Sequence, residues 1–310
     1  MTDKPRRLRR KTAAPFGPGW TVPDGGSGPV FGDREGAVAP AVRAVIRSIL
    51  LLIWTLLGVS VQAILIALPG RPKIVFARWF WAVFSRVLGI RVRLIGKPSY
   101  RGDRRPVVFA SGHSSWLDIA VLGATLDAAF ISKDDVAEWP MVSLVARLGR
   151  TVFVSRQRSS TGRELAEISD RLTEGGNLVL FPEGTTSDGS RVLPFRSPFF
   201  AVADAGTPVV IQPVSVVYDR LDGLPIGRNS RPLLAWYGDM AIAPHYWQTA
   251  RRARVRATVV LHPPLDPARF ASRKALANAS WRVVAAGSAL LRQNRDPAAS
   301  DVTHSTHAVG

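Results

Sequence analysis

The stretch from residue 48 to residue 68, SILLLIWTLLGVSVQAILIAL, carries no charged side chain over 21 residues. A helix needs about 20 apolar residues to cross the hydrocarbon core of a bilayer, whereas helices of soluble proteins seldom stay apolar on every face for so long. We therefore predict a membrane-embedded helix and rank a buried helix of a soluble fold second. A cleaved signal peptide fits less well, because the apolar stretch is too long, starts late and is followed by LPGRPK.

A second apolar stretch, IVFARWFWAVFSRVLGI at residues 74–90, places Arg78, Ser85 and Arg86 on one helical face. This pattern indicates an interfacial amphipathic helix. Tryptophans that suit a water–lipid boundary stand at positions 54, 79 and 81. Basic residues flank the first stretch on both sides, so the positive-inside rule gives no orientation. We expect a helical hairpin, or helices that dip into one leaflet, with both ends on the cytoplasmic face of the inner membrane.

The length admits one large domain or two small ones, and the charge suits an anionic partner. In 310 residues, 41 Lys and Arg stand against 23 Asp and Glu, a formal charge of +18. Such a charge suits membrane headgroups, a phosphorylated substrate or nucleic acid. The sequence contains no cysteine, which excludes disulfides and a cysteine nucleophile. Residues 1–45 are basic and rich in Gly and Pro, and residues 294–310 are polar, so we expect a disordered arm and a disordered tail.

Residues 91–293 alternate short β-branched runs with helical patterns. This alternation predicts an α/β domain with a mostly parallel sheet flanked by helices, preceded by the membrane-embedded segment at 46–90. The expected strands are 91–96, 106–111, 128–133, 151–156, 177–184, 208–218 and 254–265. The expected helices are 116–126, 140–149, 162–176 and 271–293.

Ligands of such sheets bind beyond the carboxyl ends of the strands, where SGHSSWLD, SRQRSS and PEGTTSDGS follow three expected strands. In the first of these, Ser115 and Asp118 fit a variant of the capping box, which alone would account for Asp118. The same carboxylate could accept the N–H of His113, set its tautomer and leave the other ring nitrogen as a base. The spacing by itself permits both interpretations.

Four segments in order over residues 112–214, GHSSWLD, GRTVFVSR, FPEGTTS and PVVIQPV, resemble the sequence blocks of the glycerolipid acyltransferase family, lysophosphatidic acid acyltransferase type. The resemblance implies that His113 is the general base and Asp118 its partner. The other implied residues are Arg156 for the acceptor phosphate, Glu183, Gly184 and Thr185 for the acceptor site, and Pro213 for the acyl-donor pocket. The chain departs from the usual pattern at Gly112, where the family often has Asn, and at Thr186, where it often has Arg or Ser.

A thioester is already activated, so an acyltransferase needs to position a hydroxyl, remove its proton and stabilise the oxyanion. We expect a membrane-bound O-acyltransferase that moves a fatty acyl group from acyl-CoA or acyl-carrier protein to a lysophospholipid hydroxyl. The preferred acceptor is 1-acyl-sn-glycerol-3-phosphate, giving phosphatidic acid. Lyso-ornithine lipid is the alternative, because LLAWYGDMAIAPHYW at residues 233–247 resembles bacterial members that acylate it. The expected partners are the bilayer, the donor and the acceptor, without a cofactor, a metal or nucleic acid.

Three other functions compete with acyl transfer. A serine hydrolase could use Ser114 or Ser115 with His113 and Asp118, but the sequence lacks G-x-S-x-G. A basic nucleic-acid-binding protein would explain the charge, yet no binding motif is recognisable. A non-catalytic membrane protein of the same fold is the third alternative. Turnover of acyl-CoA by the purified protein separates the enzyme from the two binding functions, and hydrolysis without an acceptor would favour the hydrolase.

Overall fold

The structure is a computed structural model that describes residues 38–102, 105–133, 152–154, 168, 170, 172–173, 176–204 and 207–297. Its helices are α1 (Val38–Ala67), α2 (Pro72–Leu88), α3 (Leu117–Thr125), α6 (Ile242–Arg251) and α7 (Arg273–Arg292). Its strands are β1 (Ile90–Ile95), β2 (Val107–Ser111), β3 (Ala128–Lys133), β4 (Val152–Val154), β5 (Asn177–Leu180), β6 (Val210–Leu221), β7 (Leu224–Pro225) and β8 (Val255–Leu261). The remaining turns are 3-10 helices at Ser99–Arg101, Ser197–Asp204, Arg228–Leu233 and Pro267–Arg269.

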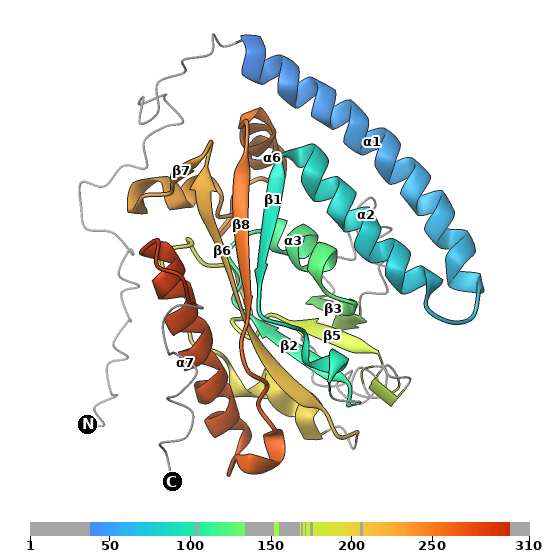
Figure 1. The fold of residues 1–310 in the computed structure, drawn as a ribbon, viewed down its shortest axis with the longest axis vertical. Coiled ribbons are helices and arrows are strands. Elements are labelled where there is room, and N and C mark those ends of the chain that lie inside the picture. The colour runs from blue at the N-terminus through green and yellow to red at the C-terminus, as the bar shows by residue number, and fades with distance from the viewer. Residues whose placement is uncertain are drawn as a thin grey trace, which may run out of the picture.

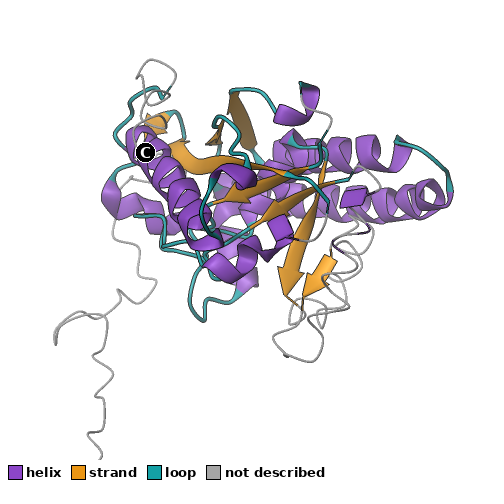
Figure 2. Ribbon diagram, turned by 90° about the horizontal axis from the view of Figure 1, so that it is seen from below, coloured by secondary structure: helices purple, strands orange, loops and turns teal. Residues whose placement is uncertain are grey.

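Seven strands form one sheet in the order β1-β8-β6-β2-β5-β3-β4, and the short β7 pairs with β6. The neighbours from β6 to β4 are parallel, and so are β1 and β8, while β8 runs antiparallel to β6. Helices lie on both faces of the sheet, with α3 on one side and α7 on the other (Figures 1 and 2). The predicted fold class, a mostly parallel sheet flanked by helices, is therefore confirmed.

The central strand β2 shows why the sheet is covered on both faces. All five of its residues are buried, and successive side chains of a strand point to opposite faces. Val107 and Phe109 join the apolar cluster formed with α2 and α3, whereas Val108 and Ala110 join the cluster formed with α7. A strand buried on both faces reads as a continuous apolar run, which is the pattern of PVVFAS.

Helices α1 and α2 form an antiparallel hairpin that lies along one flank of the molecule (Figure 1). Close contact depends on glycine at two crossings. A Cβ on Gly58 of α1 would come within 2.5 Å of Phe80 of α2, and a Cβ on Gly123 of α3 would come within 2.4 Å of Trp81. Helix α2 therefore packs between α1 and α3, and the helical hairpin predicted for this segment is present.

Helix α1 is longer than the apolar stretch that predicts it. It begins at Val38, so residues 38–45, assigned above to a disordered arm, are helical. Two arginines explain the extension, because Arg43 donates to the carbonyl of Arg251 and Arg47 donates to the carbonyls of residues 250, 252 and 253. Both guanidinium groups bind the exposed carbonyls that end α6. This tertiary contact holds the first turns of α1.

The polar face predicted for α2 is only partly correct. Ser85 is buried, and Arg78 is turned toward Asp127, which it meets at 2.8 Å between Nη1 and Oδ1. Trp81 packs against α3, while Trp79 is 54% exposed. The helix is amphipathic, but some of its polar positions bind the rest of the protein because α3 and the start of β3 lie beside it.

Most of the other described helices and strands match the predicted ones. The predicted helix at 271–293 is α7, whereas the sequence analysis did not anticipate α6. The expected helix at 140–149 and most of the one at 162–176 lie outside the described residues. The two ranges assigned to an arm and a tail are likewise described only for residues 38–45 and 294–297.

Candidate active site

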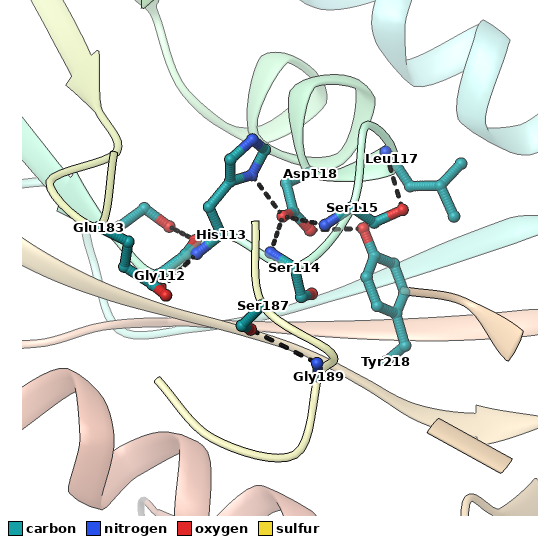
Figure 3. A network of polar contacts seen from close by, with 11 residues as sticks. Gly112, His113, Ser114, Ser115, Leu117, Asp118, Glu183, Ser187, Gly189 and Tyr218 are labelled. Carbon is teal, nitrogen blue, oxygen red and sulfur yellow. Dashed lines mark hydrogen bonds and ion pairs between the residues drawn. The ribbon is translucent and has the colours of Figure 1, made fainter. Parts of the chain in front are cut away.

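His113 and Asp118 meet at the carboxyl end of β2. One residue, Gly112, separates the end of this strand from His113, and Asp118 occupies the first turn of α3. The Nδ1 atom of His113 lies 2.9 Å from Oδ2 of Asp118 (Figure 3). A carboxylate only accepts hydrogen bonds, so Nδ1 carries the proton and Nε2 presents its lone pair. The predicted contact is present, and it leaves one ring nitrogen available as a base.

The carboxylate of Asp118 is buried, and both of its oxygens accept hydrogen bonds. Oδ2 also accepts the backbone N–H groups of Ser114 and Ser115, at 2.8 and 3.0 Å. Oδ1 accepts the hydroxyl of Tyr218 of β6 at 2.6 Å. The bond from Ser115 corresponds to one half of a capping box, but the N-cap of α3 is Trp116, which makes no side-chain cap hydrogen bond, so the predicted capping box is only partly present. Burial raises the pKa of Tyr218 well above its usual value, so this hydroxyl stays a donor.

The ring of His113 is held by stacking as well as by Asp118. It lies parallel to the ring of Phe181, with centroids 4.0 Å apart and planes inclined by 18°. Its side chain is 17% exposed, and no described residue bonds to Nε2. The ring is thus oriented by two neighbours, while its basic nitrogen is left for a reacting group.

The carboxylate of Glu183 bonds the loop after β2, which carries His113 and is called the histidine loop below. Its Oε1 accepts the backbone N–H of His113 at 2.8 Å, and its Oε2 accepts the backbone N–H of Leu193 at 2.9 Å. The side chain is buried, and this burial raises the pKa of Glu183 to about 7 although both donors act to lower it. Both oxygens face backbone donors, so the carboxylate joins the loop after β5 to the loop after β2.

This geometry predicts a pH dependence of stability. The folded-state pKa of Glu183, about 7, lies above its ordinary value of 4.5, so the folded chain holds this proton more tightly than the unfolded chain. The proton on Glu183 therefore stabilises the folded state by about 3 kcal/mol. This stabilisation is complete below pH 4.5 and is lost as the pH rises through 7. Denaturant unfolding of the wild type and Glu183→Gln across pH 4.5 to 8 measures it. We expect the wild type to lose stability relative to the variant, and parallel curves would contradict the assignment.

Other residues of the loops after β2 and β5 also shape the contact between the two loops. A Cβ on Gly112 would lie 3.3 Å from Oε1 of Glu183, so a side chain there would crowd this carboxylate. Gly184 has a φ of +70°, a conformation that favours glycine, and it turns the chain after β5. Thr185 is exposed beside it. The next turn also contacts the histidine loop, since the N–H of Ser187 donates to the carbonyl of His113 at 2.9 Å.

Two contacts of the site were missed by the sequence analysis. Tyr218 stands a hundred residues after its partner Asp118, and its only signal was a tyrosine at the end of a strand. Trp236 donates its backbone N–H to the carbonyl of Ser114 at 2.8 Å. A backbone contact of this kind has no side-chain signature.

The N–H groups of His113, Ser114 and Ser115 are all bonded to carboxylates, so none of them is free to bind an oxyanion.

The remaining implied residues are less directly connected to the histidine. Pro213 is buried in β6 opposite Ala110 of β2, next to the residue whose carbonyl accepts the N–H of Gly112. Arg156 lies outside the described residues, and its role stays a prediction. The strand before it, β4, is at the sheet edge, separated from β2 by β5 and β3. Among the described parts of the chain, no group of three His, Cys, Asp or Glu residues could hold a metal ion.

The site is arranged for general-base chemistry. Ser115 is buried, with its hydroxyl accepting the N–H of Leu117, and no serine hydroxyl bonds to His113 among the described residues. This disfavours a serine hydrolase. An oriented histidine without an adjacent nucleophile suits direct transfer between a bound hydroxyl and an activated acyl group. The fold and the site therefore suit an acyl-transfer enzyme.

The chain belongs to the acyltransferase family, as its match to the family's sequence pattern over residues 91–217 and its relatives show, and its activity is O-acyl transfer. The lyso-ornithine lipid O-acyltransferase of Rhizobium meliloti is 37% identical over 240 residues, covering 75% of this chain and 81% of that protein. The 1-acyl-sn-glycerol-3-phosphate acyltransferase of Neisseria gonorrhoeae is 30% identical over 212 residues, covering 67% and 77%. The crystal structure of the 1-acyl-sn-glycerophosphate acyltransferase of Thermotoga maritima aligns with a TM-score of 0.55 at 19% identity, covering 82% and 98%. This last similarity concerns the fold.

Proposed function

We propose that this enzyme transfers a fatty acyl group from a thioester donor, acyl-CoA or acyl-carrier protein, to the hydroxyl of lyso-ornithine lipid. The reaction rests on one observation, the His113 ring whose Nδ1 bonds Asp118 while Nε2 has no partner among the described residues. The acceptor rests on the higher identity to a lyso-ornithine lipid O-acyltransferase, 37% against 30% for the 1-acyl-sn-glycerol-3-phosphate acyltransferase of Neisseria gonorrhoeae. The preferred acceptor therefore differs from the one that the sequence blocks favour.

The reaction needs one base and no covalent intermediate. Nε2 of His113 takes the proton of the acceptor hydroxyl as its oxygen attacks the thioester carbonyl. Asp118 stabilises the imidazolium that forms. The tetrahedral intermediate then collapses, the C–S bond breaks, and the thiolate leaves with the proton from the imidazolium. An ester and a free thiol are the products.

A second acceptor, 1-acyl-sn-glycerol-3-phosphate, is supported by the similarity to the Neisseria relative and by the position of Arg156 after the TVFV run. A guanidinium at that place suits a phosphate. Purified enzyme supplied with labelled donor and each lysolipid in parallel separates the two. We expect faster acylation of lyso-ornithine lipid, and exclusive use of the phosphate-bearing lysolipid would overturn our choice.

We further propose that α1 lies in one leaflet with the catalytic domain on the same side as both of its ends. By length and composition α1 is the only described helix apolar enough to cross a membrane, and its apolar window is only 17% buried. Arg43 near its start binds the end of α6, and Arg71, four residues beyond its end, binds Asp127. The two contacts join both ends of a helix about 45 Å long to the same domain, which supports a single-leaflet arrangement along the flank shown in Figure 1.

Single cysteines test this arrangement, because the natural chain contains none. Val38→Cys and Leu68→Cys mark the two ends of α1, and Arg295→Cys marks the catalytic domain as a control. In inside-out vesicles, a membrane-impermeant maleimide is expected to label all three to a similar extent. Labelling of only one end of α1 from the side that labels Arg295→Cys would establish a spanning helix instead.

A further inference from the structure

Arg292 is a partly buried cation close to the catalytic loops. It occupies the last turn of α7, the helix that packs on the sheet face opposite α3 (Figure 1). Eight residues earlier, Val284 lies 3.6 Å from the place where a Cβ of Gly112 would be. The Nε atom of Arg292 is buried without an acceptor, and its guanidinium makes no hydrogen bond or ion pair with any described residue.

The end of α7 does not need this guanidinium. Cations are favourable near a helix C-terminus, but here the nearby carbonyl of Arg292 is capped by Arg231, whose Nη2 donates to it at 2.9 Å. The helix then closes through Asn294, which has a φ of +58°, and through the N–H of Arg295, which donates to the carbonyl of Leu290 at 2.9 Å. Capping therefore accounts for Arg231 and leaves the side chain of Arg292 unexplained.

The charge of Arg292 has no ion-pair partner among the described residues. Burial and the nearby charge of Arg231 lower the pKa of Arg292 to about 10, which still leaves it charged at neutral pH. Glu183 and Asp188 act in the opposite direction, but neither forms an ion pair with it. Glu183 is bonded to backbone groups, and Oδ1 of Asp188 accepts both the N–H and the hydroxyl of Ser190. A desolvated charge without a counterion costs stability, and such costs are concentrated at ligand sites.

A chain of contacts connects this cation to the reacting histidine. The N–H of Ser187 donates to the carbonyl of His113, and two residues later a Cβ on Gly189 would lie 3.8 Å from Cβ of Arg231. Arg231 in turn bonds the backbone of Arg292. The two arginines therefore border the turn at residues 187–189, which bonds the backbone of His113.

We propose that Arg292, with Arg231 beside it, binds the anionic group of the acceptor headgroup, a carboxylate for lyso-ornithine lipid or a phosphate for the alternative acceptor. This proposal rests on the proposed function and adds a specificity residue to it. Asp188, whose Oδ2 has no described partner, borders the same place and suits a headgroup ammonium.

Arg292→Gln and the matched control Arg295→Gln, three residues further on and exposed, test the proposal with both lysolipids and the same donor. We expect Arg292→Gln to raise the acceptor KM about 10- to 100-fold, the value of one charge-assisted hydrogen bond, with little change in kcat or donor KM. Its melting temperature should equal or exceed that of the wild type, because an unpaired charge is removed. The control should match the wild type in every measurement.

A second measurement is independent of the acceptor. Inorganic phosphate at millimolar concentration is expected to raise the melting temperature of the wild type and of Arg295→Gln more than that of Arg292→Gln. An unchanged acceptor KM, a raised donor KM, or equal phosphate shifts would overturn the proposal. A lower melting temperature with unchanged KM would assign Arg292 a structural role. If the wild type acylates neither lysolipid, the proposed function fails, and the phosphate shifts still decide whether Arg292 binds anions.

Discussion

Replacing His113 with alanine is expected to lower kcat by about 10²- to 10⁴-fold, the usual value of a general base. The reason is that Nε2 has no substitute, since the neighbouring serines cannot take a proton and Asp118 is buried with its acceptor sites occupied. Steady-state acylation by purified protein in detergent or vesicles, with saturating donor and acceptor, measures the effect. A kcat near that of the wild type would show that another group removes the proton.

A matched variant separates chemistry from folding. His113→Gln keeps a planar polar group that can donate to Asp118 and stack on Phe181, but it has no basic nitrogen. We expect it to be as inactive as His113→Ala while its melting temperature stays close to that of the wild type. Activity that follows melting temperature across the two variants would assign His113 a structural role instead.

Replacing Asp118 with asparagine is expected to lower kcat by about 10²- to 10⁴-fold as well, because the neutral amide no longer stabilises the imidazolium. The shape is preserved, since the amide oxygen can face the two loop N–H groups and the amide N–H₂ can face the Tyr218 oxygen. A stability loss of about 1 to 3 kcal/mol accompanies the change, because one buried carboxylate serves four donors. Activity assays and denaturant unfolding measure the two effects.

Tyr218→Phe is the companion variant. It removes only the donor to Oδ1 of Asp118, so it should cost a similar amount of stability while the histidine contact on Oδ2 remains. We expect a fall in kcat much smaller than that of Asp118→Asn. Equal losses of kcat in both variants would mean that orientation of the carboxylate, and not its charge, is what the histidine requires.

The local sequence predicted much of the fold and part of the site. Continuous apolar runs predicted the strands, because both faces of the sheet are covered, and the spacing of Ser115 and Asp118 predicted a helix start. His113 and Asp118 are five residues apart, so their contact depends on one turn of backbone and was predictable. The roles of Arg156, Thr185 and Pro213 remain predictions from the resemblance.

Other features were decided only by the tertiary structure, because their partners are distant in sequence. The strand order β2-β5 brings Glu183 under His113, 70 residues away, and β6 brings Tyr218 to Asp118, 100 residues away. The same holds for the first turns of α1, which are held by α6.

The sequence by itself thus determined which residues carry the reactive groups and which segments form helices and strands, since these depend on side-chain chemistry and local periodicity. The tertiary structure alone decided how the groups are held and where unpaired charge lies. Arg292 illustrates the difference. Its sequence position is that of an ordinary helix-ending arginine, and only the fold places it beside the catalytic loops without a counterion among the described residues.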